Sequence, residues 1–125
     1  MTENDITYAI RGAIFTVYNS LGPGLLESAY EAALKHELLK IGLRVQTQVG
    51  FPLIYDNTTL GLAFRLDMLI NDLVIIEIKS VETLAPVHHK QLLTYLKLTE
   101  RKVGLLVNFN TDNIREGIVR IVNNL

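Results

Sequence analysis

The stretch RLDMLINDLVIIEIKS, residues 65–80, decides the fold of this chain. Two apolar runs that are typical of strands meet here at the turn residues Asn71 and Asp72. The same runs contain three charged residues, Asp67, Glu77 and Lys79, where a small hydrophobic core would have to enclose them. The stretch therefore predicts two antiparallel strands and requires a partner for each charge.

The pairing register of these two strands decides where the charges lie. Alternation along the second strand puts four residues on one face, namely Leu73, Ile75, Glu77 and Lys79. The first strand is expected to present one apolar face, formed by Phe64, Leu66, Met68 and Ile70. A two-residue turn would pair Asp67 with Ile76 and mismatch the faces, whereas a three-residue loop or one bulge places Asp67 opposite Glu77. The pattern thus predicts two neighbouring carboxylates, which repel unless a proton, a cation such as Lys79 or a divalent metal lies between them.

Three segments have the apolar spacing of helices. The first is expected to be capped by Asp5 and to end near residue 19, and the second to run from about residue 25 to 41. Gly22, Pro23 and Gly24 separate these two segments, because they cannot all continue a helix. The third helix is expected over residues 87–100, directly after a proline.

Strand periodicity fills most of the remaining chain. Residues 43–56, 59–70 and 73–79 predict a three-stranded meander. Residues 102–109 form a continuous apolar run, which is typical of a strand buried on both faces. The last segment, 113–124, fits either period, and its β-branched residues favour a strand. The order ααβββαβ predicts an α/β fold with a mixed α+β sheet.

Composition limits the classes of protein that need to be considered. A chain of 125 residues can build one core, so residues 1–125 are expected to form a single domain. The chain has no cysteine, which excludes disulfides, thiolate metal sites and cysteine nucleophiles. The beginning of the sequence lacks the features of a signal peptide, and no apolar run approaches the roughly 20 residues of a membrane span, so a cytoplasmic protein is expected. A net charge of −1 with scattered Lys and Arg does not indicate a strong hold on nucleic acid.

The charged residues also have a simpler interpretation. On a half-exposed sheet Asp67, Glu77 and Lys79 would be ordinary solvated charges, although three helices that must cover this sheet argue against it. Gln91 and Tyr95 are four residues apart on the third predicted helix and share a face. They could orient a carboxylate, a water or a phosphate, but an amphipathic helix with Tyr95 in the core explains the same spacing.

Read in chain order, these residues resemble the motifs of the PD-(D/E)XK nuclease superfamily. The matching elements are Glu27 in GLLESAY (residues 24–30), Asp67, EIK (residues 77–79) and QLLTY (residues 91–95). GLLESAY also resembles the motif that names the GxxExxY protein family within that superfamily. The resemblance covers nearly the whole chain and implies a restriction-endonuclease-like αβββαβ core, here with an extra N-terminal helix.

The resemblance further implies a Mg²⁺- or Mn²⁺-dependent phosphodiesterase that acts on DNA or RNA. It assigns the metal to Glu27, Asp67, Glu77 and the carbonyl of Ile78. Lys79 would position or activate the attacking water, and Gln91 and Tyr95 would support the site. A small, nearly neutral domain needs more surface to hold a duplex, which leaves a homodimer open. Two alternatives remain: a non-catalytic module on the same fold that binds nucleic acid or protein, which the net charge favours, and a structural or oligomerisation domain, which the apolar composition favours.

Overall fold

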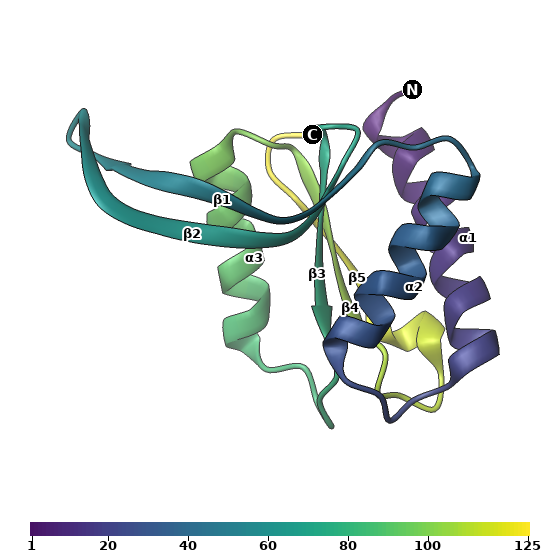
Figure 1. Ribbon diagram of the computed structural model, residues 1–125. Coiled ribbons are helices and arrows are strands. Elements are labelled where there is room, and N and C mark those ends of the chain that lie inside the picture. Colours follow the sequence, from purple (N-terminus) through teal and green to yellow (C-terminus); the bar gives the residue numbers. More distant parts are fainter.

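The computed structural model describes residues 1–125, apart from the side chain of Leu62. The elements in chain order are α1 (Glu3–Leu21), α2 (Glu27–Lys40), β1 (Val45–Tyr55), β2 (Thr58–Ile70), β3 (Val74–Lys79), α3 (Pro86–Thr99), β4 (Val103–Asn108), a 3₁₀ turn (Ile114–Gly117) and β5 (Ile118–Val122) (Figure 1). The expected αβββαβ core, preceded by an extra helix, is therefore confirmed. The last segment is a strand only in its second half.

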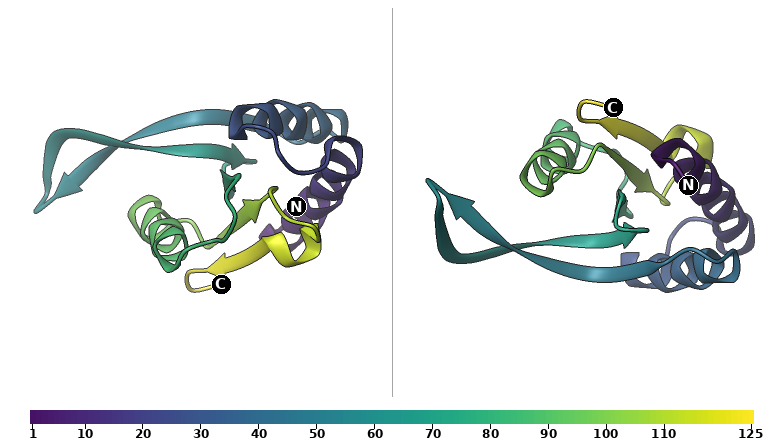
Figure 2. Two further views of the ribbon diagram at one scale, coloured as in Figure 1. Left: turned by 90° about the horizontal axis from the view of Figure 1, so that it is seen from below. Right: turned by 90° about the horizontal axis from the view of Figure 1, so that it is seen from above.

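The strands form one five-stranded sheet in the order β1-β2-β3-β4-β5. β3 and β4 are parallel and the other neighbours are antiparallel, so the sheet is mixed, as expected. α1 and α2 pack on one face of the sheet and α3 packs on the other (Figure 2). No helix of the described residues is both long enough and apolar enough to cross a membrane.

β1 and β2 extend beyond the rest of the sheet as a hairpin, which we call the hairpin arm (Figures 1 and 2). Its turn residues Asp56 and Asn57 have φ of 54° and 57°, the left-handed pair that suits the twist of a two-residue hairpin. The base of the arm is held against α3 by two ring stacks, with centroids 5.7 Å apart for Phe51 and Phe64 and 5.0 Å apart for Phe64 and Tyr95. The arm is thus anchored next to α3 and free at its tip.

The prediction that β2 has one continuous apolar face is wrong. Met68 and Ile70 belong to the core under α1 and α2, whereas Phe64 and Leu66 pack with the core under α3. The side chains change face near Asp67, where β2 leaves β3 and continues into the arm (Figure 1). A period-2 pattern cannot show such a change of face, because it assumes that the alternation continues unbroken along the strand.

The expected helix starts also need correction. Thr2, and not Asp5, is the N-cap of α1: the Thr2 hydroxyl accepts from the Asp5 N–H, and the Asp5 carboxylate accepts from the Thr2 N–H, a reciprocal capping box. α2 begins at Glu27, two residues later than predicted, which makes Glu27 its first residue. Its carboxylate therefore lies at the helix end that favours negative charge.

Candidate functional site

The site is built on the register between β2 and β3. Residue pairs Met68–Ile76, Leu69–Ile75 and Ile70–Val74 face each other, and the residues 71–73 form the turn. The three-residue loop expected from the sequence is therefore confirmed. Continued by one pair, this register sets Asp67 opposite Glu77.

Beyond these three residue pairs, hydrogen bonds to the two carboxylates take the place of backbone pairing between β2 and β3. The backbone N–H of Asp67 donates to Oε2 of Glu77 at 2.8 Å, and the N–H of Ile78 donates to Oδ2 of Asp67 at 2.8 Å. Each strand thus presents an acid to the backbone of the other, at the point where β2 turns away. We call Asp67 and Glu77 the carboxylate pair.

The carboxylate pair forms no ion pair among the described residues. Glu77 is 4% exposed, and burial together with the charge of Asp67 raises its pKa from 4.5 to about 8. The hydrogen bond from the Asp67 backbone and the charge of Lys79 lower this pKa only in part. Lys79 is half-buried, and within the described residues it forms no ion pair with either acid. Near neutral pH the pair therefore retains a proton unless a further cation binds.

The free oxygens of the carboxylate pair suit a hard divalent cation. Each acid uses one oxygen for a backbone N–H, and no hydrogen bond engages Oδ1 of Asp67 or Oε1 of Glu77 among the described residues. Every fully buried polar side-chain atom of the described residues has a hydrogen-bond partner. Because these two oxygens have none, they are not fully buried and reach solvent. Carboxylate oxygens that reach solvent are ligands that Mg²⁺ and Mn²⁺ prefer. The residues present therefore fit the metal that the motifs imply.

Glu27 is the first residue of α2, which packs on the face of the sheet opposite to α3. Its side chain is exposed at the start of α2, and its charge contributes to the raised pKa of Glu77. Among the described residues, however, no three His, Cys, Asp or Glu side chains are close enough to form a ready metal cluster. The structure thus brings Asp67 and Glu77 together and leaves Glu27 nearby.

Tyr95 of α3 lies close to the carboxylate pair. Burial, followed by the charges of Glu77 and then Asp67, raises the pKa of its phenol. Gln91, one turn earlier on α3, is exposed, and its side chain makes no hydrogen bond to the described site residues. The sequence therefore identified a residue near the site in Tyr95, while the role of Gln91 stays a prediction.

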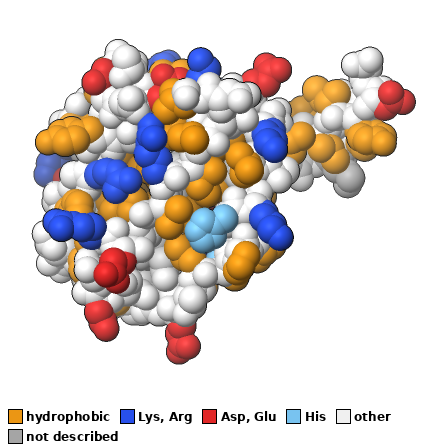
Figure 3. Space-filling model, turned by 180° about the vertical axis from the view of Figure 1, so that it is seen from behind, with side chains coloured by type: hydrophobic (Ala, Val, Ile, Leu, Met, Phe, Trp, Pro, Cys, Tyr) orange, Lys and Arg blue, Asp and Glu red, His pale blue; other side chains and the backbone are white. Residues whose placement is uncertain are grey.

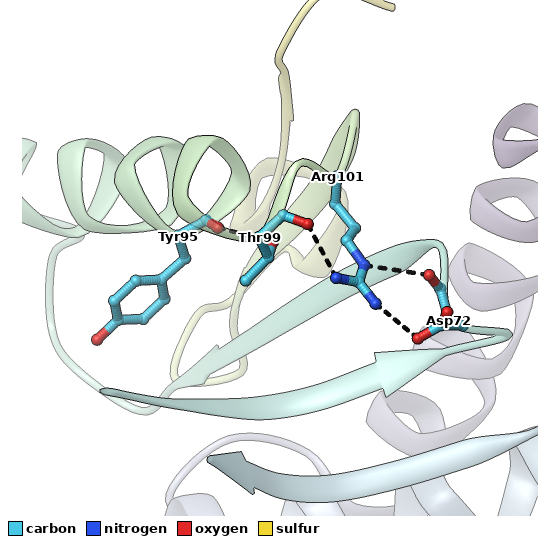
Figure 4. Close-up of polar contacts among 4 residues, drawn as sticks. All are labelled: Asp72, Tyr95, Thr99 and Arg101. Atoms are coloured by element: carbon cyan, nitrogen blue, oxygen red, sulfur yellow. Dashed lines mark hydrogen bonds and ion pairs between the residues drawn. The ribbon is translucent and has the colours of Figure 1, made fainter. Parts of the chain in front are cut away.

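Arg101 fastens the end of α3 to the turn that sets the register (Figure 4). Its guanidinium donates to the carboxylate of Asp72 at 2.6 Å and to the carbonyl of Thr99 at 2.9 Å. The hydroxyl of Thr99 in turn donates to the carbonyl of Tyr95 at 2.8 Å. This chain of contacts fixes α3 relative to the β2–β3 turn, and sequence reasoning had not singled out Arg101.

Asn108 is a second residue that the sequence analysis missed. It is buried beside Lys79 in the β3–β4 ladder, and its side chain accepts from the N–H of Val81 at 3.1 Å and donates to the carbonyl of Val81 at 2.8 Å. It thereby holds the segment that follows Lys79. A polar residue that ends a fully buried strand is the signal that could have identified it. A cleft of about 720 Å³ next to Asn108 contains none of the predicted site residues.

Comparisons with known proteins identify the superfamily of the chain and a similar fold. The sequence model of the PD-(D/E)XK nuclease superfamily matches residues 4–121, and the chain belongs to that superfamily. The solved structure of SSO0001 is similar, with a TM-score of 0.58 and 27% sequence identity over 79% of this chain and 51% of SSO0001. The chain therefore corresponds to about half the length of SSO0001. No curated protein sequence matches it.

Proposed function

We propose that this protein, as one domain over residues 1–125, is a Mg²⁺- or Mn²⁺-dependent nuclease that hydrolyses phosphodiester bonds at the carboxylate pair. The observation that carries the proposal is the pair itself: two acids held together by backbone N–H groups, one of them buried with a pKa of about 8, with free oxygens and no ion pair among the described residues. Two neighbouring carboxylates, one of them buried, lower the stability of the folded protein. Such an arrangement is expected at a site where a bound ligand offsets their charge.

Each predicted site residue has a role in this proposal. Asp67 and Glu77 would hold the metal, with Glu27 and the Ile78 carbonyl as additional ligands. Bound there, a divalent cation supplies an acidified water and offsets the charge of the phosphate. Lys79 remains free of the acids, so its ammonium can donate to the attacking water or to the phosphate oxygens that gain charge. Tyr95 and Gln91 would orient the groups above the pair.

Nucleic acid, DNA or RNA, is the proposed substrate. The net charge of −1 is unevenly spread: on the face opposite to that of Figure 1, Lys and Arg side chains lie across the body, while most Asp and Glu side chains lie toward its rim (Figure 3). A face with this charge distribution can approach phosphates. Gly24, Glu27 and Tyr30 fit the motif of the GxxExxY family, and we propose that the chain belongs to this branch.

Metal titration tests the proposal most directly. Calorimetry with Mn²⁺ should show one saturable site in the wild type, loss of binding in Asp67→Asn, and unchanged binding in Asp56→Asn at the tip of the arm. Lys79→Ala should keep the metal site but lose at least about a hundredfold in cleavage of labelled DNA or RNA, because a fixed donor to developing charge is removed. Absence of Mn²⁺ binding in the wild type would refute the proposal.

A non-catalytic binding module is the second candidate. The observation that favours it is the exposed position of Glu27, which leaves no ready cluster of three acidic ligands in the described residues. Such a module would bind nucleic acid equally well in chelator, and Glu77→Gln would not change its affinity. The nuclease proposal requires both treatments to abolish cleavage.

A further inference from the structure

The loop that precedes α2 is held by the hydroxyl of Tyr30. Tyr30 is fully buried, and its hydroxyl accepts from the N–H of Leu25 at 3.1 Å and donates to the carbonyl of Gly22 at 2.6 Å. One side chain therefore joins both ends of the loop between α1 and α2. Both hydrogen bonds of the Tyr30 hydroxyl are thus to the backbone of this loop.

The same loop is tied to the end of β3. The hydroxyl of Ser80 donates to the carbonyl of Leu25 at 2.7 Å, so Leu25 is held through its N–H by Tyr30 and through its carbonyl by Ser80. Ser80 directly follows Lys79 in the chain. The loop before α2 and the end of β3 are thus directly connected.

A stack of rings adds a second connection between these parts. The ring of Tyr30 lies parallel to that of Phe109, with centroids 4.3 Å apart and an angle of 4° between the planes. The N–H of Phe109 donates to the carbonyl of Lys79 at 3.0 Å. Tyr30 is therefore linked to Lys79 through Phe109 and through the loop.

We propose that Tyr30 and Ser80 are positioning residues that hold Glu27 in reach of the carboxylate pair, which deepens the proposed function and rests on it. Both the N–H and the carbonyl of Leu25 are hydrogen-bonded to side chains, and Leu25 lies only two residues before Glu27. The side chain of Glu27 is exposed and makes no hydrogen bond among the described residues, so its place depends on the loop that leads into α2. Without this anchor the Glu27 carboxylate would sample more positions, and its contribution to a bound cation would fall.

Mn²⁺ calorimetry on the full chain tests this inference through Tyr30→Phe, which keeps the ring stack and removes only the hydroxyl. Tyr30→Phe and Glu27→Gln should each weaken Mn²⁺ binding by about tenfold, the usual range for residues that orient a metal ligand. The double variant should bind no more weakly than Glu27→Gln alone, because both changes remove the same contribution, that of the Glu27 carboxylate. Ser80→Ala should act in the same direction.

Tyr18→Phe is the matched control, since the Tyr18 hydroxyl also donates to a backbone carbonyl, that of Thr111, and among the described residues makes no hydrogen bond to Leu25. It should leave Mn²⁺ binding unchanged, and amide exchange should speed up at Leu25 only in Tyr30→Phe and Ser80→Ala. Wild-type affinity in both of these variants would overturn the inference, as would additive losses in the double variant or full affinity in Glu27→Gln. Those results leave the nuclease proposal standing, whereas a wild type that binds no Mn²⁺ refutes both.

Discussion

Replacing Glu77 by glutamine should remove a pH dependence of folding that this one side chain creates. Between pH 4.5 and about 8 the folded protein holds a proton on Glu77 that the unfolded chain has lost. The free energy of unfolding should therefore fall as the pH rises through this window and level off above it. Each pKa unit corresponds to about 1.4 kcal/mol, so the full fall is on the order of 5 kcal/mol.

Urea denaturation across this pH range, with a chelator present, measures the effect. A glutamine carbonyl can still accept the hydrogen bond from the backbone of Asp67, so Glu77→Gln should match the wild type below pH 4.5 and exceed it by several kcal/mol above pH 8. Glu82→Gln, which alters an exposed acid just beyond β3, should follow the wild type throughout. Saturating Mn²⁺ should flatten the wild-type curve, because the metal replaces the proton.

Parallel pH curves for the wild type and Glu77→Gln would refute this reasoning. They would mean that Glu77 ionises with an ordinary pKa and that the negative charge of the carboxylate pair does not destabilise the folded protein. A lower stability of Glu77→Gln above pH 8 would refute it as well, since the charge of Glu77 would then stabilise the folded state.

Two further changes test the packing around the site by urea denaturation. Gly117→Ala should lower the free energy of unfolding by about 2 kcal/mol, because the new Cβ would lie 2.5 Å from the carbonyl oxygen of Asn108; Gly12→Ala, where nothing lies within 4 Å, should not destabilise. Arg101→Ala should cost about 1 kcal/mol, because it releases Asp72 and the end of α3; an unchanged stability would show that this connection is not needed.

The carboxylate pair could be predicted from the sequence because two independent patterns agree on it. The alternation in β3 and the need to match apolar faces across the turn leave one register that pairs Asp67 with Glu77, and the structure has that register. The motif match led to the same residues. Local pattern was sufficient here, since both acids lie within one hairpin.

The surroundings of the pair could not be predicted in the same way. The change of face in β2 near Asp67, which puts Leu66 and Met68 in different cores, breaks the period-2 alternation and has no signal in the local sequence pattern. The hydroxyl contacts of Tyr30 depend on a loop whose course is set by tertiary packing. Glu27 is the clearest case: its motif placed it at the site, but its distance from the pair depends on that loop.

The turn between β2 and β3 also limits how this protein can change over evolution. Asp67 and Glu77 are ten residues apart in the chain, and the three-residue turn accounts for that number. One residue inserted into or deleted from either strand of this interval, unless a bulge or a change in the turn absorbs it, would move the side chains to the opposite face and separate the acids. We therefore expect relatives that keep the site to conserve the length of this interval, even where every residue of the turn has been replaced.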